Sequence, residues 1–155
     1  MKKHHYTIQL QWTGNLGKGT EKYDSYSRDH EIAAHRKPII LGSSDPAFRG
    51  DTNRYNPEEL LVSTLSSCHM LWYLHLCSVN QITVIRYEDN PTGVMIELKD
   101  GSGRFEKVTL QPVVVIKEKA NKHLAENLHE EAHRNCFIAN SVNFPVNCQP
   151  TLKIE

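Results

Sequence analysis

The chain has 155 residues, a length that suits a single domain, residues 1–155, with a sizeable hydrophobic core. Its 18 basic and 18 acidic residues cancel, so the sequence offers no basic surface for nucleic acid or for an anionic membrane. We expect neither of these partners.

The opening residues are polar and lead at once into a strand pattern. Tyr6, Ile8, Leu10 and Trp12 alternate with polar residues, which predicts a half-buried strand. No apolar segment of a secretory signal precedes this strand, so we expect a cytoplasmic protein. In that compartment the four cysteines would rest as reduced thiols, and any disulfide would be a transient redox event.

A second strand is predicted at residues 21–28, returning antiparallel after a turn around three glycines. Residues 29–55 are rich in Gly, Pro, Ser and Asp and predict a long connection, a kind of segment that is often functional. Arg28 ends the second strand, and Arg49 and Arg54 lie within the connection. Arg54 is close to Asp51, which predicts a surface ion pair.

The most apolar segment, residues 56–79, predicts a long helix. Asn56 suits the N-cap, Pro57 the first helical position and Glu59 the acidic position of a capping box. No formally charged residue follows Glu59 until Arg86, so we expect the helix to lie inside the protein. Its polar residues favour a protein core over a lipid span. One small sheet covers only one side of it, and a second copy of the chain is the simplest cover for the other.

Cys68 lies at the centre of this helix. Most cysteines in such places are small inert hydrophobes, and that interpretation stays open for Cys68. A second cysteine in a matching context favours a reactive thiol. Residues 120–142 predict another helix, and if it stops near Asn135, Cys136 opens a new turn. Unpaired N–H groups there would lower the pKa of the Cys136 thiol, so the two cysteines are candidates for a reactive pair.

Further strands are predicted at residues 82–88, 94–99, 104–117 and 151–154, with hairpin turns at 90–93 and 100–103. A sheet with one large apolar helix favours an α+β fold. We interpret the remaining cysteines, Cys77 and Cys148, as a core thiol and a strand-end thiol.

The residues around Cys68 resemble the signature of the OsmC/Ohr family, the osmotically inducible and organic hydroperoxide resistance proteins. That signature is Asn-Pro-Glu, here ending at Glu58, followed by a cysteine ten residues after the glutamate, here Cys68. Cys136 matches the family's second cysteine in place and context. The resemblance covers most of the chain and implies an OsmC-like fold, with antiparallel sheets around a long buried central helix in an intertwined homodimer.

The resemblance also implies a thiol-dependent peroxidase that reduces organic hydroperoxides and has no resident cofactor or metal. Cys68 is the expected peroxidatic residue and Cys136 the resolving one, with an external thiol or dithiol as reductant. An arginine, Arg49 or Arg28, is expected to stabilise the Cys68 thiolate, and Glu58 to hold that arginine. Glu58 and Cys68 lie roughly 15 Å apart along the helix, so a shared site needs a bridging residue or the partner subunit.

Two positions depart from the family pattern. Phe137 follows Cys136 where proline is common, and His69 follows Cys68 where peroxide-reducing members carry an aromatic residue such as phenylalanine. These departures indicate an outlying subgroup. They keep open a second hypothesis, a non-enzymatic member that binds a small apolar ligand or senses oxidants.

A competing motif lies in the second predicted helix. His129 and His133 fit H-E-x-x-H, the zinc signature of metalloproteases, with both rings on one helix face. The nearby charges of Glu131 and Arg134, and the lack of a clear third ligand, favour an exposed polar helix face instead. We therefore expect no zinc in this segment. Cys68 and its neighbour in sequence point about 100° apart on a helix, so they are not expected to share a metal either.

Overall fold

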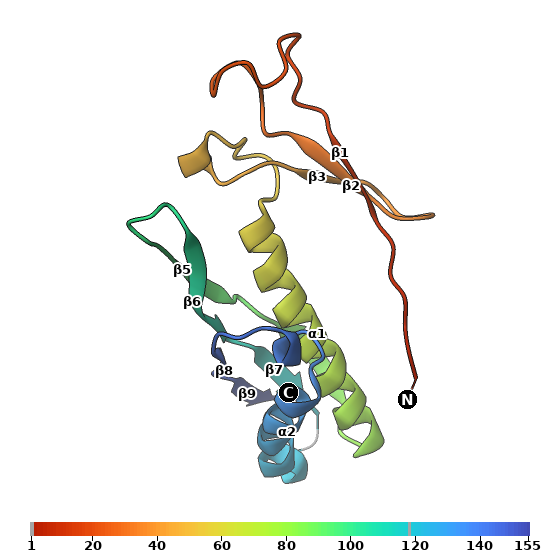
Figure 1. The fold of residues 1–155 in the computed structure, drawn as a ribbon. Helices are drawn as coiled ribbons and strands as arrows, with labels where there is room; N and C mark the ends of the chain where they lie inside the picture. The colour runs from red at the N-terminus through yellow and green to blue at the C-terminus, as the bar shows by residue number, and fades with distance from the viewer. Residues whose placement is uncertain (1, 118) are drawn as a thin grey trace. The chain divides into compact units, whose positions relative to one another are not determined.

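The computed structural model describes residues 2–117 and 119–155, with the side chain of Ala120 excepted. It divides into two compact units, Met1–Leu60 and Leu61–Glu155. The first unit holds one sheet and the first turn of the long helix α1, and the second holds the rest of α1, the helix α2 and two sheets (Figure 1). A single domain over residues 1–155 stays a prediction.

The first unit is built on an antiparallel sheet in the order β1-β2-β3. Its strands are β1 (Gln9–Trp12), β2 (His30–Ala33) and β3 (Ile40–Gly42), and the short 3-10 turn η1 (Pro46–Phe48) follows. All four residues of β1 are exposed, so the prediction of a half-buried strand was wrong. The return strand predicted at residues 21–28 was also wrong, because β2 and β3 lie inside the supposed connection. Because β2 and β3 are short and lie among polar residues, the sequence pattern does not predict them as strands.

The long helix α1 (Pro57–Val79) has the bounds that the sequence predicts. Its capping box is complete: the backbone N–H of Glu59 donates to Asn56 Oδ1 at 2.7 Å, and that of Asn56 donates to the Glu59 carboxylate at 3.1 Å. Only one stripe of α1 is buried, while Leu71 and Val79 are 63% and 61% exposed. In a single chain, the prediction of a fully enclosed helix was therefore wrong.

By length and composition, α1 is the one helix among the described residues that could cross a membrane. The core helix of a soluble protein passes the same test. Here the buried stripe of α1 packs against strands and against α2, as a core helix does.

Two mixed sheets make up the rest of the second unit. One has the order β4-β7-β9, from β4 (Val84–Glu88), β7 (Val113–Ile116) and β9 (Thr151–Ile154); the other has the order β5-β6-β8, from β5 (Thr92–Glu97), β6 (Gly103–Leu110) and β8 (Val146–Cys148). The first pair in each sheet is antiparallel and the second is parallel.

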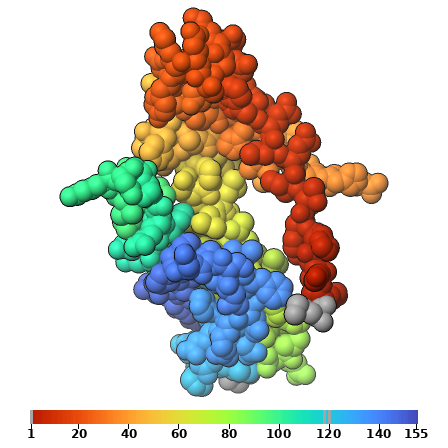
Figure 2. Space-filling view, in the orientation of Figure 1, coloured from red at the N-terminus to blue at the C-terminus, as the bar shows by residue number. Residues whose placement is uncertain are grey.

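The two predicted hairpins have different outcomes. The turn at residues 100–103 does join an antiparallel pair, β5 and β6, whose green tip projects from the second unit in Figure 2. The turn at residues 90–93 joins no hairpin, because β4 pairs with β7 and β5 pairs with β6. The predicted turn is therefore confirmed at residues 100–103 and was wrong at 90–93, where β5 already begins at Thr92, because the choice of partner strand depends on distant residues.

The helix α2 (Lys122–Asn135) is shorter than the predicted segment 120–142 and stops at Asn135, the end at which Cys136 opens a new turn. It lies between the 3-10 turns η2 (Lys119–Asn121) and η3 (Ala139–Ser141). Tyr73 of α1, Val114 of β7 and Leu128 of α2 belong to one buried cluster. A second cluster forms around Leu65 of α1 and Val108 of β6. The two helices are thus fixed side by side on the sheets, and this arrangement brings the chain after α2 back to the middle of α1.

Candidate functional site

The two cysteines predicted to act together are in contact. Cys68 lies near the middle of α1, Cys136 is the first residue after α2, and the thiol of Cys68 lies close enough to that of Cys136 to raise its pKa. Cys68 is partly exposed, whereas Cys136 is 1% exposed. One thiol of the pair can therefore meet a molecule from solvent while the other is held behind it.

The surroundings of Cys136 contain two opposing influences on its pKa. The backbone N–H of Ala139 donates to Cys136 Sγ at 3.4 Å, and the N–H of Ile138 also favours the thiolate. Burial acts more strongly in the other direction, and together with the neighbouring Cys68 thiol it raises the pKa of Cys136 to about 11. The predicted turn is present, but the predicted lowering of this pKa was wrong because desolvation outweighs the turn's N–H groups. Cys136 is a neutral thiol at neutral pH.

Two aromatic side chains lie beside the thiol pair. Trp72 is one helical turn after Cys68, and Phe137 follows Cys136. Their rings meet edge to face with centroids 5.7 Å apart, and Phe137 is 66% exposed. The family departure at Phe137 therefore adds an exposed aromatic ring directly after the buried thiol, in contact with Trp72 of α1.

The charged residues predicted for the site belong to the first unit. One carboxylate oxygen of Glu58, in the first turn of α1, is buried with no hydrogen-bond partner among the described residues. The guanidinium of Arg28 lies 4.3 Å from the ring centroids of Tyr23 and Tyr26 and donates to both of their carbonyls at 2.8 Å. Arg49, which has a positive φ of 66°, lies 6.0 Å from the ring centroid of Tyr23. Which arginine serves Cys68 stays a prediction.

Arg54 forms the ion pair that the sequence predicts, with Asp51 at 3.6 Å, and a second pair with Asp29 at 3.6 Å. Its side chain is only 23% exposed, so this is a partly buried network of the first unit and not a simple surface pair.

A second cluster, which the sequence does not predict, joins His69, His129 and Cys148. His69 Nε2 lies 3.1 Å from His129 Nδ1 and 3.6 Å from Cys148 Sγ. The two rings are nearly parallel, and the ring of Tyr73 stacks on His129 with centroids 3.8 Å apart. His69 is 0% and His129 is 3% exposed, so the predicted exposed helix face was wrong at His129. The buried side of α2 is wider than its apolar residues indicate.

Burial also determines the charge of this cluster. It lowers the pKa of His69 to about 4 and that of His129 to about 3, and it raises the pKa of Cys148 to about 12. Both imidazoles and the Cys148 thiol are therefore neutral at neutral pH. Cys77, as predicted, is a core thiol, 1% exposed, and burial raises its pKa as well.

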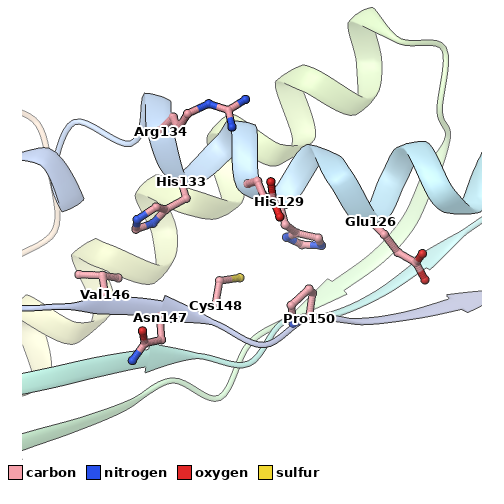
Figure 3. A pocket seen from close by; sticks show the side chains of 9 residues that line it. Glu126, His129, His133, Arg134, Val146, Asn147, Cys148 and Pro150 are labelled. Atoms are coloured by element: carbon pink, nitrogen blue, oxygen red, sulfur yellow. The ribbon is translucent and has the colours of Figure 1, made fainter.

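A pocket of about 440 Å³ lies beside the cluster, between one face of α2 and the strand β8 (Figure 3). His129 and Cys148 reach it from opposite sides, and the ring of His133 also points into it, whereas Arg134 extends away. Its lining consists of Glu126, His129, Glu130, His133, Arg134, Val146, Asn147, Cys148 and Pro150. The helix face that carries the H-E-x-x-H pattern is thus the wall of a pocket.

Comparison with known proteins identifies relatives of this chain. The family model described as OsmC-like protein matches residues 50–151. An OsmC-like protein of unknown function from Vibrio cholerae is 30% identical, with 96% of this chain and 99% of that chain covered and a TM-score of 0.86.

More distant structures share the fold. An organic hydroperoxide resistance protein from Elizabethkingia anophelis is 16% identical, with 99% and 100% of the two chains covered and a TM-score of 0.66. The organic hydroperoxide resistance protein OhrB of Bacillus subtilis is 19% identical, with 96% and 98% covered and a TM-score of 0.60. None of the curated proteins matches the chain.

Proposed function

The chain belongs to the OsmC-like protein family, and on that premise we propose that it is a thiol-dependent peroxidase that reduces organic hydroperoxides. The observation that carries the proposal is the proximity of the thiols of Cys68 and Cys136. A disulfide requires the two Cα atoms to come within roughly 7 Å, and thiols already in contact need little further movement to bond.

In the first step, the Cys68 thiolate attacks the terminal oxygen of the hydroperoxide. A sulfur–oxygen bond forms, the oxygen–oxygen bond breaks, and the departing alkoxide takes a proton and leaves as an alcohol. Cys68 is left as a sulfenic acid. Its partial exposure suits this role, because the substrate must reach the sulfur from solvent.

In the second step, Cys136 loses its proton and its sulfur attacks the Cys68 sulfenic sulfur. A disulfide forms and water leaves. An external thiol or dithiol then reduces the disulfide through a mixed disulfide and is itself oxidised, which returns both cysteines to thiols. The buried, neutral Cys136 thiol does not suit the first step, because a thiol held in its protonated form reacts poorly with peroxide.

The neighbouring aromatic rings support an organic substrate over hydrogen peroxide. Trp72 and the exposed Phe137 offer apolar surface beside Cys68 to which an alkyl or aryl group can bind. Hydrogen peroxide has no such group and gains nothing from these rings.

A positive charge that stabilises the Cys68 thiolate is also part of the proposal. An arginine, Arg28 or Arg49, would stabilise the Cys68 thiolate, and the unpartnered carboxylate oxygen of Glu58 is suited to hold a guanidinium. A second copy of the chain would cover Leu71 and Val79, which α1 leaves exposed. We therefore propose a homodimer as the working form.

Steady-state kinetics with cumene hydroperoxide and dithiothreitol, compared with hydrogen peroxide, test the proposal. We expect kcat/KM to be higher for cumene hydroperoxide by at least about tenfold, which corresponds to about 1.4 kcal/mol of apolar contact. The Cys68→Ser variant should lose turnover, and the Cys77→Ser variant, which alters a buried thiol outside the pair, should keep it.

The Cys136→Ser variant separates the two steps. It should reduce about one equivalent of peroxide and then stop as a sulfenic acid that excess peroxide oxidises further. Peroxide consumption by the wild type no faster than by Cys68→Ser, with either substrate, would reject the peroxidase and favour a member of the fold that binds or senses without turnover.

A further inference from the structure

We propose that His69, His129 and Cys148 form a binding site for a zinc ion, separate from the Cys68–Cys136 pair. The three side chains come from α1, α2 and the end of β8, all in the second unit. Each offers one ligand atom, and the three atoms lie within 4.8 Å of one another. Imidazole nitrogen and thiolate sulfur are the ligand types that Zn²⁺ prefers.

The distances match tetrahedral zinc. Zinc–nitrogen bonds of about 2.05 Å and zinc–sulfur bonds of about 2.3 Å give edges of about 3.3 Å between two nitrogens and about 3.6 Å between nitrogen and sulfur. The observed edges are 3.1 Å between His69 Nε2 and His129 Nδ1, and 3.6 Å between His69 Nε2 and Cys148 Sγ. The third edge is at most 4.8 Å, so Cys148 Sγ needs to approach His129 by no more than about 1.2 Å.

The inner nitrogens of the two rings are the ones placed to bind a metal. The outer nitrogens, His69 Nδ1 and His129 Nε2, are buried and have no hydrogen-bond partner among the described residues. The inner nitrogens, His69 Nε2 and His129 Nδ1, face each other at 3.1 Å, and bonds from both to zinc would place the ring N–H groups on the outer nitrogens. The stacked ring of Tyr73 fixes the orientation of His129, and regular elements hold all three ligands, as a preformed site requires.

The charges around the cluster suit a dication. Binding would displace the proton of Cys148 and leave a thiolate, so the metal and its three ligands would carry one net positive charge. The carboxylate of Asp89 is close enough to act electrostatically on both His69 and Cys148. Asp89 is itself held by Ser66 Oγ and by the backbone N–H of Gln111, which donates at 2.7 Å. It would balance the remaining charge without being a ligand.

The fourth coordination position would open onto the pocket between α2 and β8. His129 and Cys148 both line this pocket, and it is large enough to admit water or a small ligand (Figure 3). Three protein ligands with an accessible fourth position are the arrangement of reactive zinc sites, in contrast to the four closed ligands of structural ones.

Cobalt substitution tests the site directly. The full-length protein, reduced and freed of metal by chelation, would be titrated with Co²⁺ under anaerobic conditions. We expect one Co²⁺ per chain, with the visible bands of tetrahedral cobalt and a near-ultraviolet thiolate-to-cobalt band, both abolished by one equivalent of Zn²⁺. Cys148→Ser should remove the thiolate band, and His129→Gln should weaken zinc binding by at least about 100-fold.

Variants of residues outside the cluster serve as controls for the cobalt titration. Cys77→Ser and His123→Gln, which alter a buried thiol and an exposed imidazole outside the cluster, should bind as the wild type does. A Cys68→Ser/Cys136→Ser double variant should keep the thiolate band. Loss of the band in this double variant, its survival in Cys148→Ser, or the absence of stoichiometric binding in the wild type would overturn the proposal.

An alkylation experiment on the wild-type protein does not depend on variants that could misfold. One equivalent of Zn²⁺ should slow alkylation of Cys148 in the wild-type protein by at least about tenfold, while the rate at Cys68 stays unchanged. Mass spectrometry of the cysteine peptides measures both rates at once. Protection of Cys68 in place of Cys148 would assign the metal to the other thiols and overturn the proposal.

Discussion

Iodoacetamide should alkylate Cys136 far more slowly in the native protein than in the same chain unfolded in urea. The thiolate is the reactive form, so the rate follows its population. Burial and the neighbouring Cys68 thiol raise the pKa of Cys136 from an ordinary 9.0 to about 11. Two pH units reduce the thiolate fraction near neutral pH about 100-fold, and the 1% exposure of the side chain slows the reaction further.

Pulse labelling with mass spectrometry of the Cys136 peptide gives the rate. Initial rates at low conversion keep Cys68 largely unmodified. We expect the native rate to be at least about 100-fold below the rate in urea near pH 7.5 and to rise about tenfold per pH unit towards pH 11. A native rate within about tenfold of the urea rate, or a plateau below pH 9, would refute the argument that burial outweighs the N–H groups of the turn.

The same shift has a consequence for stability. The folded chain holds the Cys136 proton more tightly than the unfolded chain does, because the folded pKa is the higher of the two. The contribution of this group is therefore complete below pH 9 and is lost as the pH rises from about 9 towards about 11. Urea unfolding at a series of alkaline pH values should show this loss in the wild type and a weaker one in Cys136→Ser.

Leu65→Ala should lower the free energy of unfolding by about 3 kcal/mol in a urea titration, because Leu65 is 0% exposed in the core between α1 and β6. Leu98→Ala, at a 44% exposed position, should change the free energy of unfolding by less than about 0.5 kcal/mol. Sedimentation at low micromolar concentration should find a dimer, and Leu71→Asp should shift the protein towards monomer. A well-folded monomeric wild type would contradict the proposal that a second copy covers the exposed side of α1. Of Arg28→Ala and Arg49→Ala, one should lower kcat/KM by roughly 100-fold or more with the fold retained by circular dichroism, and full activity in both would remove the arginine from the proposal.

Local signals predicted the long helix well. Asn56, Pro57 and Glu59 determine where α1 begins through contacts within one turn, so its start follows from neighbouring residues alone. The match of Glu58 and Cys68 to a family signature pointed to the second cysteine, Cys136, across 68 residues of sequence.

Elements that depend on distant partners were not predictable in this way. The strands β2 and β3 are short and lie among turn residues. Only their pairing identifies them, β2 with β1 and β3 with β2. The cluster of His69, His129 and Cys148 spans three elements, with 60 and 79 residues between contacting members. The burial of His129 was missed because its neighbours Glu130 and Glu131 are charged, although Ala125 and Ala132, one turn away on either side, are apolar.

The most direct test of the thiol-pair mechanism is to map the disulfide formed in one turnover. Reduced wild-type protein would be treated with one equivalent of cumene hydroperoxide in the absence of reductant, then digested without reduction and analysed by mass spectrometry. We predict a single major cross-linked peptide pair joining Cys68 to Cys136, reversed by dithiothreitol and absent from Cys68→Ser. Cross-links from Cys68 to Cys77 or Cys148, or no cross-link while peroxide is consumed, would contradict the mechanism.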